Sequence, residues 1–133
     1  MKKTNNKKEI KVLIVDDEIE FADTLMTRLN LRQYKAEMAS SGQAAIDLIG
    51  KNSFDVIIVD LRMPDINGLE LLSYIKGKGL ATEVIILTGH GSSASGSEGI
   101  KRGAFDYLMK PVDFHLLLEK IEGAFTKSTT EEA

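Results

Sequence analysis

The chain has 133 residues, 43% hydrophobic and 28% charged, which fits one ordinary globular domain with a sizeable core. It contains no cysteine, which excludes disulfide frameworks and zinc–thiolate sites, and no apolar run approaches the roughly 20 residues of a membrane span. The net charge of −3 is uneven, because residues 1–11 hold five lysines and one glutamate while the rest carries a net −7.

Residues 1–8 are predicted to form a basic, disordered leader. No aromatic residue is interleaved with its lysines, and the acidic body argues against direct nucleic-acid binding. The leader also lacks the apolar stretch of a signal peptide, so we expect a cytoplasmic protein with no membrane partner.

From residue 9 onward, short apolar runs alternate with amphipathic segments. Strands are expected at Ile10–Asp17, Lys35–Ser40, Phe54–Asp60, Glu83–Gly89 and Phe105–Pro111, and helices at Glu18–Asn30, Ser41–Lys51, Asn67–Gly79 and Asp113–Phe125. The single domain is therefore expected to span residues 9–125. Residues 126–133 show no apolar periodicity and are expected to form a loose tail.

The segment at residues 92–103 is expected to form only a weak fourth helix. Gly96 and Gly99 lie in its interior, and each costs about 1 kcal/mol relative to alanine in a helix. Only Ala94 and Ile100 offer apolar surface. We expect residues 92–102 to be frayed, shortened or displaced; the alternative, that tertiary contacts enforce a complete helix, stays open.

Alternating strands and helices indicate an α/β fold with a doubly wound parallel sheet covered on both faces. In such sheets, ligands bind beyond the carboxyl ends of the strands. Asp16 and Asp17 end the first strand, Asp60 the third, Thr88 the fourth and Lys110 the fifth. Three carboxylates, a hydroxyl and an ammonium are therefore expected at one edge.

Clustered carboxylates repel one another unless a cation lies among them, and oxygen ligands suit Mg²⁺. An ionised aspartate can itself act as the nucleophile in phosphoryl transfer, which depends mainly on positioning and charge stabilisation. Asp60 is the candidate acceptor. Taken singly, Asp16 and Asp17 could be acids favoured at a helix N-terminus, and Lys110 a solvated lysine.

The chain resembles the receiver domain of two-component response regulators over residues 9–125. The resemblance rests on VDDE (15–18), VDLRMPDINGLELL (59–72), LTGHG (87–91) and GAFDYLMKP (103–111). It implies a flavodoxin-like sheet of strand order 2-1-3-4-5. It also implies that the chain accepts a phosphoryl group from a sensor histidine kinase or a phosphotransfer protein, and that it can form a homodimer.

The resemblance assigns the site residues by position. Asp60 would be the phospho-acceptor and a metal ligand, Asp17 a direct Mg²⁺ ligand, and Asp16 a member of the same acidic pocket. The backbone carbonyl of Arg62 would complete the protein ligands.

The switch residues follow from the same resemblance. Thr88 would hydrogen-bond the phosphoryl group, Lys110 would pair with it, and Tyr107 would change rotamer on activation. The Lys110–Pro111 peptide would be cis. Such a domain is not an enzyme in the usual sense, because it catalyses only its own phosphorylation and dephosphorylation.

Two other functions share parts of this pattern. A Mg²⁺-dependent phosphohydrolase with an aspartyl nucleophile usually has a second acid two residues after the nucleophile, where this chain has Arg62, and no cap domain is visible. A nucleotide-binding module would need a glycine-rich loop after the first strand, where the chain reads DDEIEF.

Overall fold

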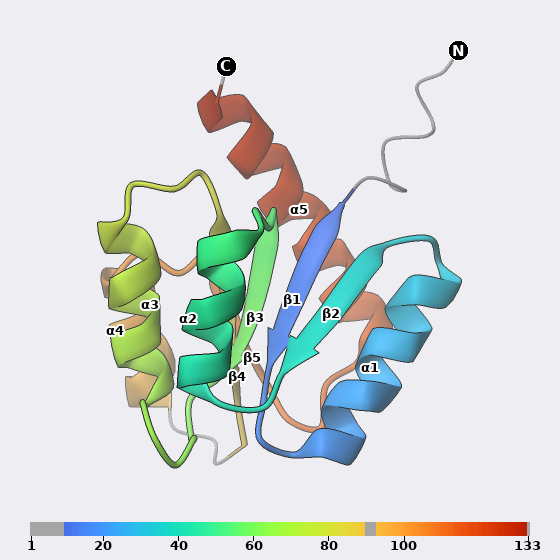
Figure 1. Ribbon diagram of the computed structural model, residues 1–133, viewed down its shortest axis with the longest axis horizontal. Coiled ribbons are helices and arrows are strands. Elements are labelled where there is room, and N and C mark those ends of the chain that lie inside the picture. The colour runs from blue at the N-terminus through green and yellow to red at the C-terminus, as the bar shows by residue number, and fades with distance from the viewer. Residues whose placement is uncertain (1–9, 90–92, 133) are drawn as a thin grey trace.

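The computed structural model describes residues 10–89 and 93–132, which form a three-layer α/β fold (Figure 1). Its strands are β1 (Lys11–Val15), β2 (Lys35–Ala39), β3 (Val56–Asp60), β4 (Glu83–Thr88) and β5 (Asp106–Met109). Its helices are α1 (Ile19–Leu31), α2 (Gly42–Lys51), α3 (Gly68–Gly77), α4 (Ser93–Lys101) and α5 (Phe114–Glu132). The predicted leader, residues 1–8, lies outside the described residues.

The sheet confirms the predicted order, β2-β1-β3-β4-β5, and all its neighbouring strands are parallel. The central strand β3 is buried along its whole length, as the apolar run from Val56 to Val59 predicts. Its last residue, Asp60, lies beside Leu87 of β4. All five strands point the same way, so their carboxyl ends share one edge, the lower one in Figure 1.

Two apolar cores lie on opposite faces of the sheet. One core packs α1 and α5 against it, with Leu25 and Leu117 among the buried residues. The other packs α2 and α3, with Ile49 and Leu71, and α4 lies on this same side (Figure 1). Among the described helices, none is long and apolar enough to cross a membrane.

Side-chain caps fix where three helices begin. The Ser41 hydroxyl accepts a hydrogen bond from the Ala44 N–H at the start of α2. Asp113 does the same for the His115 N–H at the start of α5. The side-chain Oδ1 of Asn67 accepts a hydrogen bond from the Glu70 N–H at the start of α3.

The weak fourth helix predicted from the sequence is instead a continuous helix, α4, over Ser93–Lys101. The glycines that argued against it face the sheet. A Cβ on Gly96 would lie 2.4 Å from two ring atoms of Tyr107, and one on Gly99 would lie 2.2 Å from Ile86 Cδ1. The described side chains of α4 contribute nothing to either apolar core, and Ile100 is 42% exposed, as the missing apolar stripe predicts. The helix is continuous because β-strand side chains fill the space that helix side chains would otherwise occupy.

The tail expected at residues 126–133 is also different, because α5 continues to Glu132. Ser128 is 1% exposed, and its hydroxyl donates a hydrogen bond to the Ala81 carbonyl. Lys127 Nζ lies 3.6 Å from a carboxylate oxygen of the buried Glu83. These polar contacts carry no apolar periodicity, which is why the sequence pattern missed them. The end of α5 projects beyond the amino ends of the strands (Figure 1).

Candidate functional site

Three aspartates meet at the carboxyl edge of the sheet. Carboxylate oxygens of Asp16, Asp17 and Asp60 lie within 4.8 Å of one another. Asp16 and Asp60 are 1% and 6% exposed, whereas Asp17 faces solvent. The backbone fixes Asp16, because its N–H donates to the Ala39 carbonyl at 3.0 Å.

Lys110 brings a single ammonium to this cluster. Its Nζ lies 2.8 Å from Asp16 Oδ2, 2.6 Å from Glu18 Oε1 and 4.0 Å from Asp60 Oδ1. Burial disfavours the charged ammonium, but the hydrogen bonds to Asp16 and Glu18 outweigh it and raise the pKa of Lys110. The ammonium also lies 4.4 Å from the centre of the Phe21 ring. The Lys110–Pro111 peptide is cis, as predicted.

Glu18 also belongs to the cluster, although it was not among the predicted site residues. Its side chain makes no cap hydrogen bond to α1. The hydrogen bond from Lys110 instead lowers the pKa of the Glu18 carboxyl. The helix-terminus reading holds partly for Asp16, whose Oδ1 accepts a hydrogen bond from the Glu18 N–H at 2.9 Å.

The surroundings of Asp60 disfavour its ionised form. Burial, and then the charge of Asp16, raise its pKa to about 6, against the opposing effect of Lys110. At neutral pH the ionised carboxylate therefore lies where it is poorly solvated and repelled. A cation beside it would relieve both effects, and an all-oxygen donor set of three carboxylates fits Mg²⁺.

A pocket of about 630 Å³ opens over the cluster. Asp17, Glu18, Asp60, Arg62 and Lys110 are among its lining residues. Its size and its mixture of acids with one lysine fit a phosphoryl group together with a divalent cation.

Thr88 and Tyr107, the other predicted switch residues, lie close in the sheet but differ in exposure. Thr88 is buried at the end of β4, and its carbonyl accepts a hydrogen bond from the Lys110 N–H at 2.9 Å. Tyr107 is half-buried on β5, with its ring against Gly96. Their proposed roles toward a phosphoryl group stay predictions, as does that of the Arg62 carbonyl toward a metal.

The comparisons with known proteins all indicate the same family. Residues 12–122 match the family model described as response regulator receiver domain. The transcriptional regulatory protein ZraR of Escherichia coli is 34% identical over 93% of this chain, and the response regulator protein PilR of Pseudomonas aeruginosa is 36% identical over 86%. The chain spans only 28% and 26% of the length of these two relatives.

Solved structures agree. A response regulator receiver domain protein from Clostridium thermocellum has a TM-score of 0.86 at 33% identity, covering 91% of this chain and 98% of that one. The beryllofluoride-activated NtrC4 receiver domain dimer has a TM-score of 0.84 at 34% identity, covering 89% and 98%.

Proposed function

The chain belongs to the response regulator receiver domain family, and on that premise we propose that it accepts a phosphoryl group on Asp60 in a Mg²⁺-dependent reaction and switches conformation in response. The observation that carries the proposal is the position of Asp60. It is a buried carboxylate at the tip of the central strand, clustered with Asp16 and Asp17, and it lines a pocket together with Lys110.

In the proposed reaction, a carboxylate oxygen of Asp60 attacks the phosphorus atom of the donor. A new O–P bond forms an acyl phosphate, and the bond from phosphorus to the leaving group of the donor breaks. Lys110 then offers its ammonium to the phosphoryl oxygens, and Thr88 its hydroxyl.

Asp17, Asp16, Asp60 and the carbonyl of Arg62 would hold Mg²⁺. The bound ion would neutralise charge on the phosphoryl oxygens during transfer. The support for this assignment is the donor set itself, since oxygens of three carboxylates lie within 4.8 Å of one another.

The proposed phosphodonor is a sensor histidine kinase or a phosphotransfer protein, and the proposed location is the cytoplasm, where such kinases find ATP. A homodimer is part of the proposal, supported by the NtrC4 relative, whose activated receiver domain is described as a dimer. We propose no direct contact of this domain with nucleic acid, in keeping with its acidic body.

The phosphohydrolase alternative is not favoured. Arg62 occupies the position where such enzymes place their second acid, and the relatives are response regulators. We therefore expect the chain to catalyse only its own phosphorylation and dephosphorylation, with no turnover of free phosphate esters.

Intact-mass spectrometry after incubation with acetyl phosphate tests the proposal. Wild type should gain one phosphoryl group with Mg²⁺ and none with a chelator, and Asp60→Asn should gain none under either condition. Asp47→Asn, which changes an exposed aspartate of α2, is the matched control and should behave as wild type. Equal modification of wild type and Asp60→Asn would overturn the assignment.

A further inference from the structure

The loop that follows Asp60 is attached to α2, a helix that has no role in the proposed mechanism. Asp65 lies in this loop, between β3 and α3, and its side chain is exposed. Its carboxylate nevertheless accepts hydrogen bonds from the N–H groups of Gly42, at 3.0 Å, and Gln43, at 2.9 Å. These bonds hold the pKa of Asp65 below its usual range.

Gly42 and Gln43 are the first two residues of α2, so their N–H groups have no partner within the helix. The third N–H of the helix, that of Ala44, goes to the Ser41 hydroxyl. The N-terminus of α2 is therefore capped jointly, by its own serine and by an aspartate from a different part of the chain. A negative charge is also favoured there by the helix dipole.

An apolar contact accompanies the polar one. A Cβ on Gly42 would lie 2.7 Å from Ile66 Cβ, so the Ile66 side chain rests directly on the helix backbone. Asp65 and Ile66 thus attach the loop to α2 through two different kinds of contact.

This attachment limits the freedom of Arg62. Leu61 is fixed to β4 by a hydrogen bond from its N–H to the Leu87 carbonyl, at 3.2 Å, and its own carbonyl accepts the Gly68 N–H at 2.9 Å. Only three residues separate Leu61 from Asp65, and one of them, Pro64, has a fixed φ and restricts the residue before it.

We propose that Asp65 is a positioning residue for phosphoryl transfer. By binding the N-terminus of α2, its carboxylate holds the backbone of Arg62 at the acidic cluster. The inference rests on the proposed function, because only there does the Arg62 carbonyl act as a metal ligand. It adds that α2, on the face of the sheet opposite α1, takes part in shaping the metal site.

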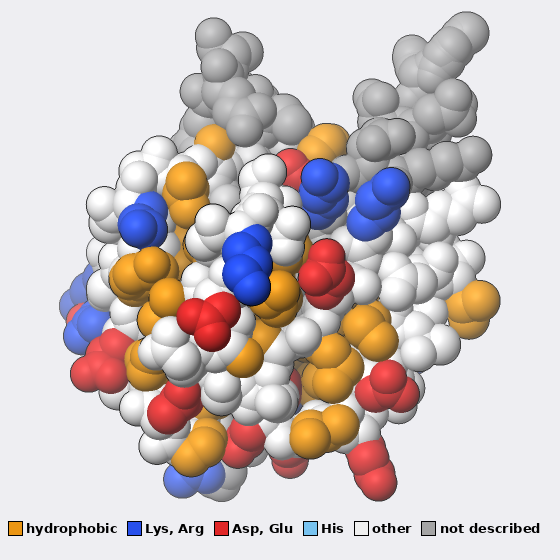
Figure 2. Space-filling view, in the orientation of Figure 1, with side chains coloured by type: hydrophobic (Ala, Val, Ile, Leu, Met, Phe, Trp, Pro, Cys, Tyr) orange, Lys and Arg blue, Asp and Glu red, His pale blue; other side chains and the backbone are white. Residues whose placement is uncertain are grey.

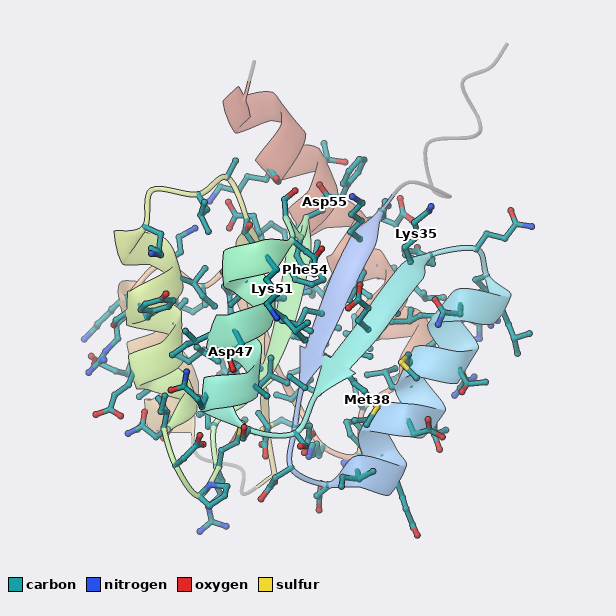
Figure 3. All side chains as sticks on the ribbon, viewed as in Figure 1. Lys35, Met38, Asp47, Lys51, Phe54 and Asp55 are labelled. Atoms are coloured by element: carbon teal, nitrogen blue, oxygen red, sulfur yellow. The ribbon has the colours of Figure 1, made fainter. Side chains whose placement is uncertain are left out.

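The test compares Asp65→Ala and Asp65→Asn with the control Asp47→Asn. Asp47 is also an exposed carboxylate near Gln43, whose side-chain amide donates to it, but Asp47 makes its contact on the outward face of α2 (Figure 3). The control therefore removes an equal charge that contacts the same helix, α2, and leaves the loop untouched. All proteins are compared at a temperature where circular dichroism shows them folded.

The first readout is Mg²⁺ affinity from backbone amide NMR shifts, measured without phosphodonor. Asp65→Ala should bind Mg²⁺ about tenfold more weakly, the lower end of what is lost when residues that orient metal ligands are changed. Asp65→Asn keeps one acceptor oxygen and should lose less, and Asp47→Asn should match wild type. Wild-type affinity in Asp65→Ala, or equal weakening in Asp47→Asn, would overturn the proposal. If Asp65→Ala does not fold, the Mg²⁺ affinity of Asp65→Asn is compared with that of Asp47→Asn instead.

The second readout needs no metal and separates this inference from the proposed function. Hydrogen exchange of the Gly68 amide, which closes the loop onto Leu61, should be faster in Asp65→Ala than in Asp47→Asn. If wild type binds no Mg²⁺, the proposed function fails, and this exchange rate alone decides the positioning claim. Unchanged exchange in Asp65→Ala would overturn it.

Discussion

The two ends of the sheet both combine acids with lysines, yet they are built for different purposes. The open pole, at the carboxyl ends, consists of Asp16, Asp17, Asp60, Glu18 and Lys110. The closed pole, at the amino ends, consists of Thr82, Glu83, Lys76, Lys127 and Ser128. In Figure 2, most acidic side chains on the visible face lie in the lower half of the molecule and most basic ones in the upper half, although both kinds occur in each half.

The balance of charge separates the poles. Four carboxylates surround one ammonium at the open pole, beneath an accessible pocket. At the closed pole, one fully buried carboxylate, that of Glu83, lies 3.7 Å from Lys76 Nζ and 3.6 Å from Lys127 Nζ. Unbalanced negative charge beneath an accessible pocket is typical of a binding site. A buried carboxylate that is neutralised by neighbouring lysines is typical of a structural ion pair.

Removing lysine should give the sharpest contrast between the poles. Lys110→Ala should lose nearly all of the conformational response, because no other ammonium in the described part of the chain reaches the cluster. Lys76→Met should leave the response intact. Comparing NMR shifts with and without a beryllofluoride phosphate mimic measures both. A full response in Lys110→Ala would show that the two poles do not differ in this way.

Removing a carboxylate at the open pole should stabilise the fold. In the folded state the pKa of Asp60 rises from 3.8 to about 6, so the folded protein holds this proton more tightly than the unfolded chain does. The free energy of unfolding of the wild type therefore decreases as the pH rises from about 4 to about 6, and it stays at the lower value at higher pH. At 1.36 kcal/mol per pKa unit, Asp60→Asn should be about 3 kcal/mol more stable at pH 7 and gain little at pH 4.

Urea denaturation at the two pH values measures this difference, and saturating Mg²⁺ should shrink it at pH 7. A destabilised Asp60→Asn protein at pH 7 would mean that the aspartates at the open pole do not repel one another as described.

At the closed pole, removing charge should destabilise the fold. The double variant Lys76→Met, Lys127→Met leaves a buried carboxylate that has lost both lysines and should lower the free energy of unfolding by about 2 kcal/mol. This is less than for fully buried pairs, because the two lysine side chains are 27% and 49% exposed. Adding Glu83→Gln should restore most of the loss in thermal or urea melts. No restoration would count against a charge-based explanation.

The smallest effect concerns the end of α5. Ser128→Ala removes a hydrogen bond to the Ala81 carbonyl and should cost about 1 kcal/mol, with faster hydrogen exchange in the last turns of α5. Thr126→Ala is the control, because Thr126 is exposed and its hydroxyl donates to the Glu122 carbonyl of the same helix, at 3.0 Å. Equal exchange in both variants would show that the closed pole does not hold α5.

Most of the fold could be predicted because it rests on local patterns. The β-branched runs, the caps Ser41 and Asp113, and the aspartates that end β1 and β3 are all visible in short stretches. The residues that were missed act between elements. Glu18 meets Lys110 across 92 positions, and Asp65 meets Gly42 across 23, so no local pattern reveals them.

Polar contacts at the closed pole were missed for a related reason. Hydrophobic periodicity reports apolar burial only, and Ser128 and Glu83 are buried polar groups. The glycines of α4 were judged by helix propensity alone, which is a property of an isolated helix and contains no information about side chains entering from a sheet.

Tyr107 occupies the space in which a side chain at position 96 would lie. If the ring turned away from α4, it would vacate the space that it now fills, and Gly96 has no side chain that could occupy this space. Losing the packing of this half-buried ring is unfavourable, and the backbone of α4 is the part of the protein that lies next to the space. If Tyr107 changes rotamer as predicted, Gly96 would allow α4 to move into the space that the ring leaves, and the rotation of one side chain would become the displacement of a helix.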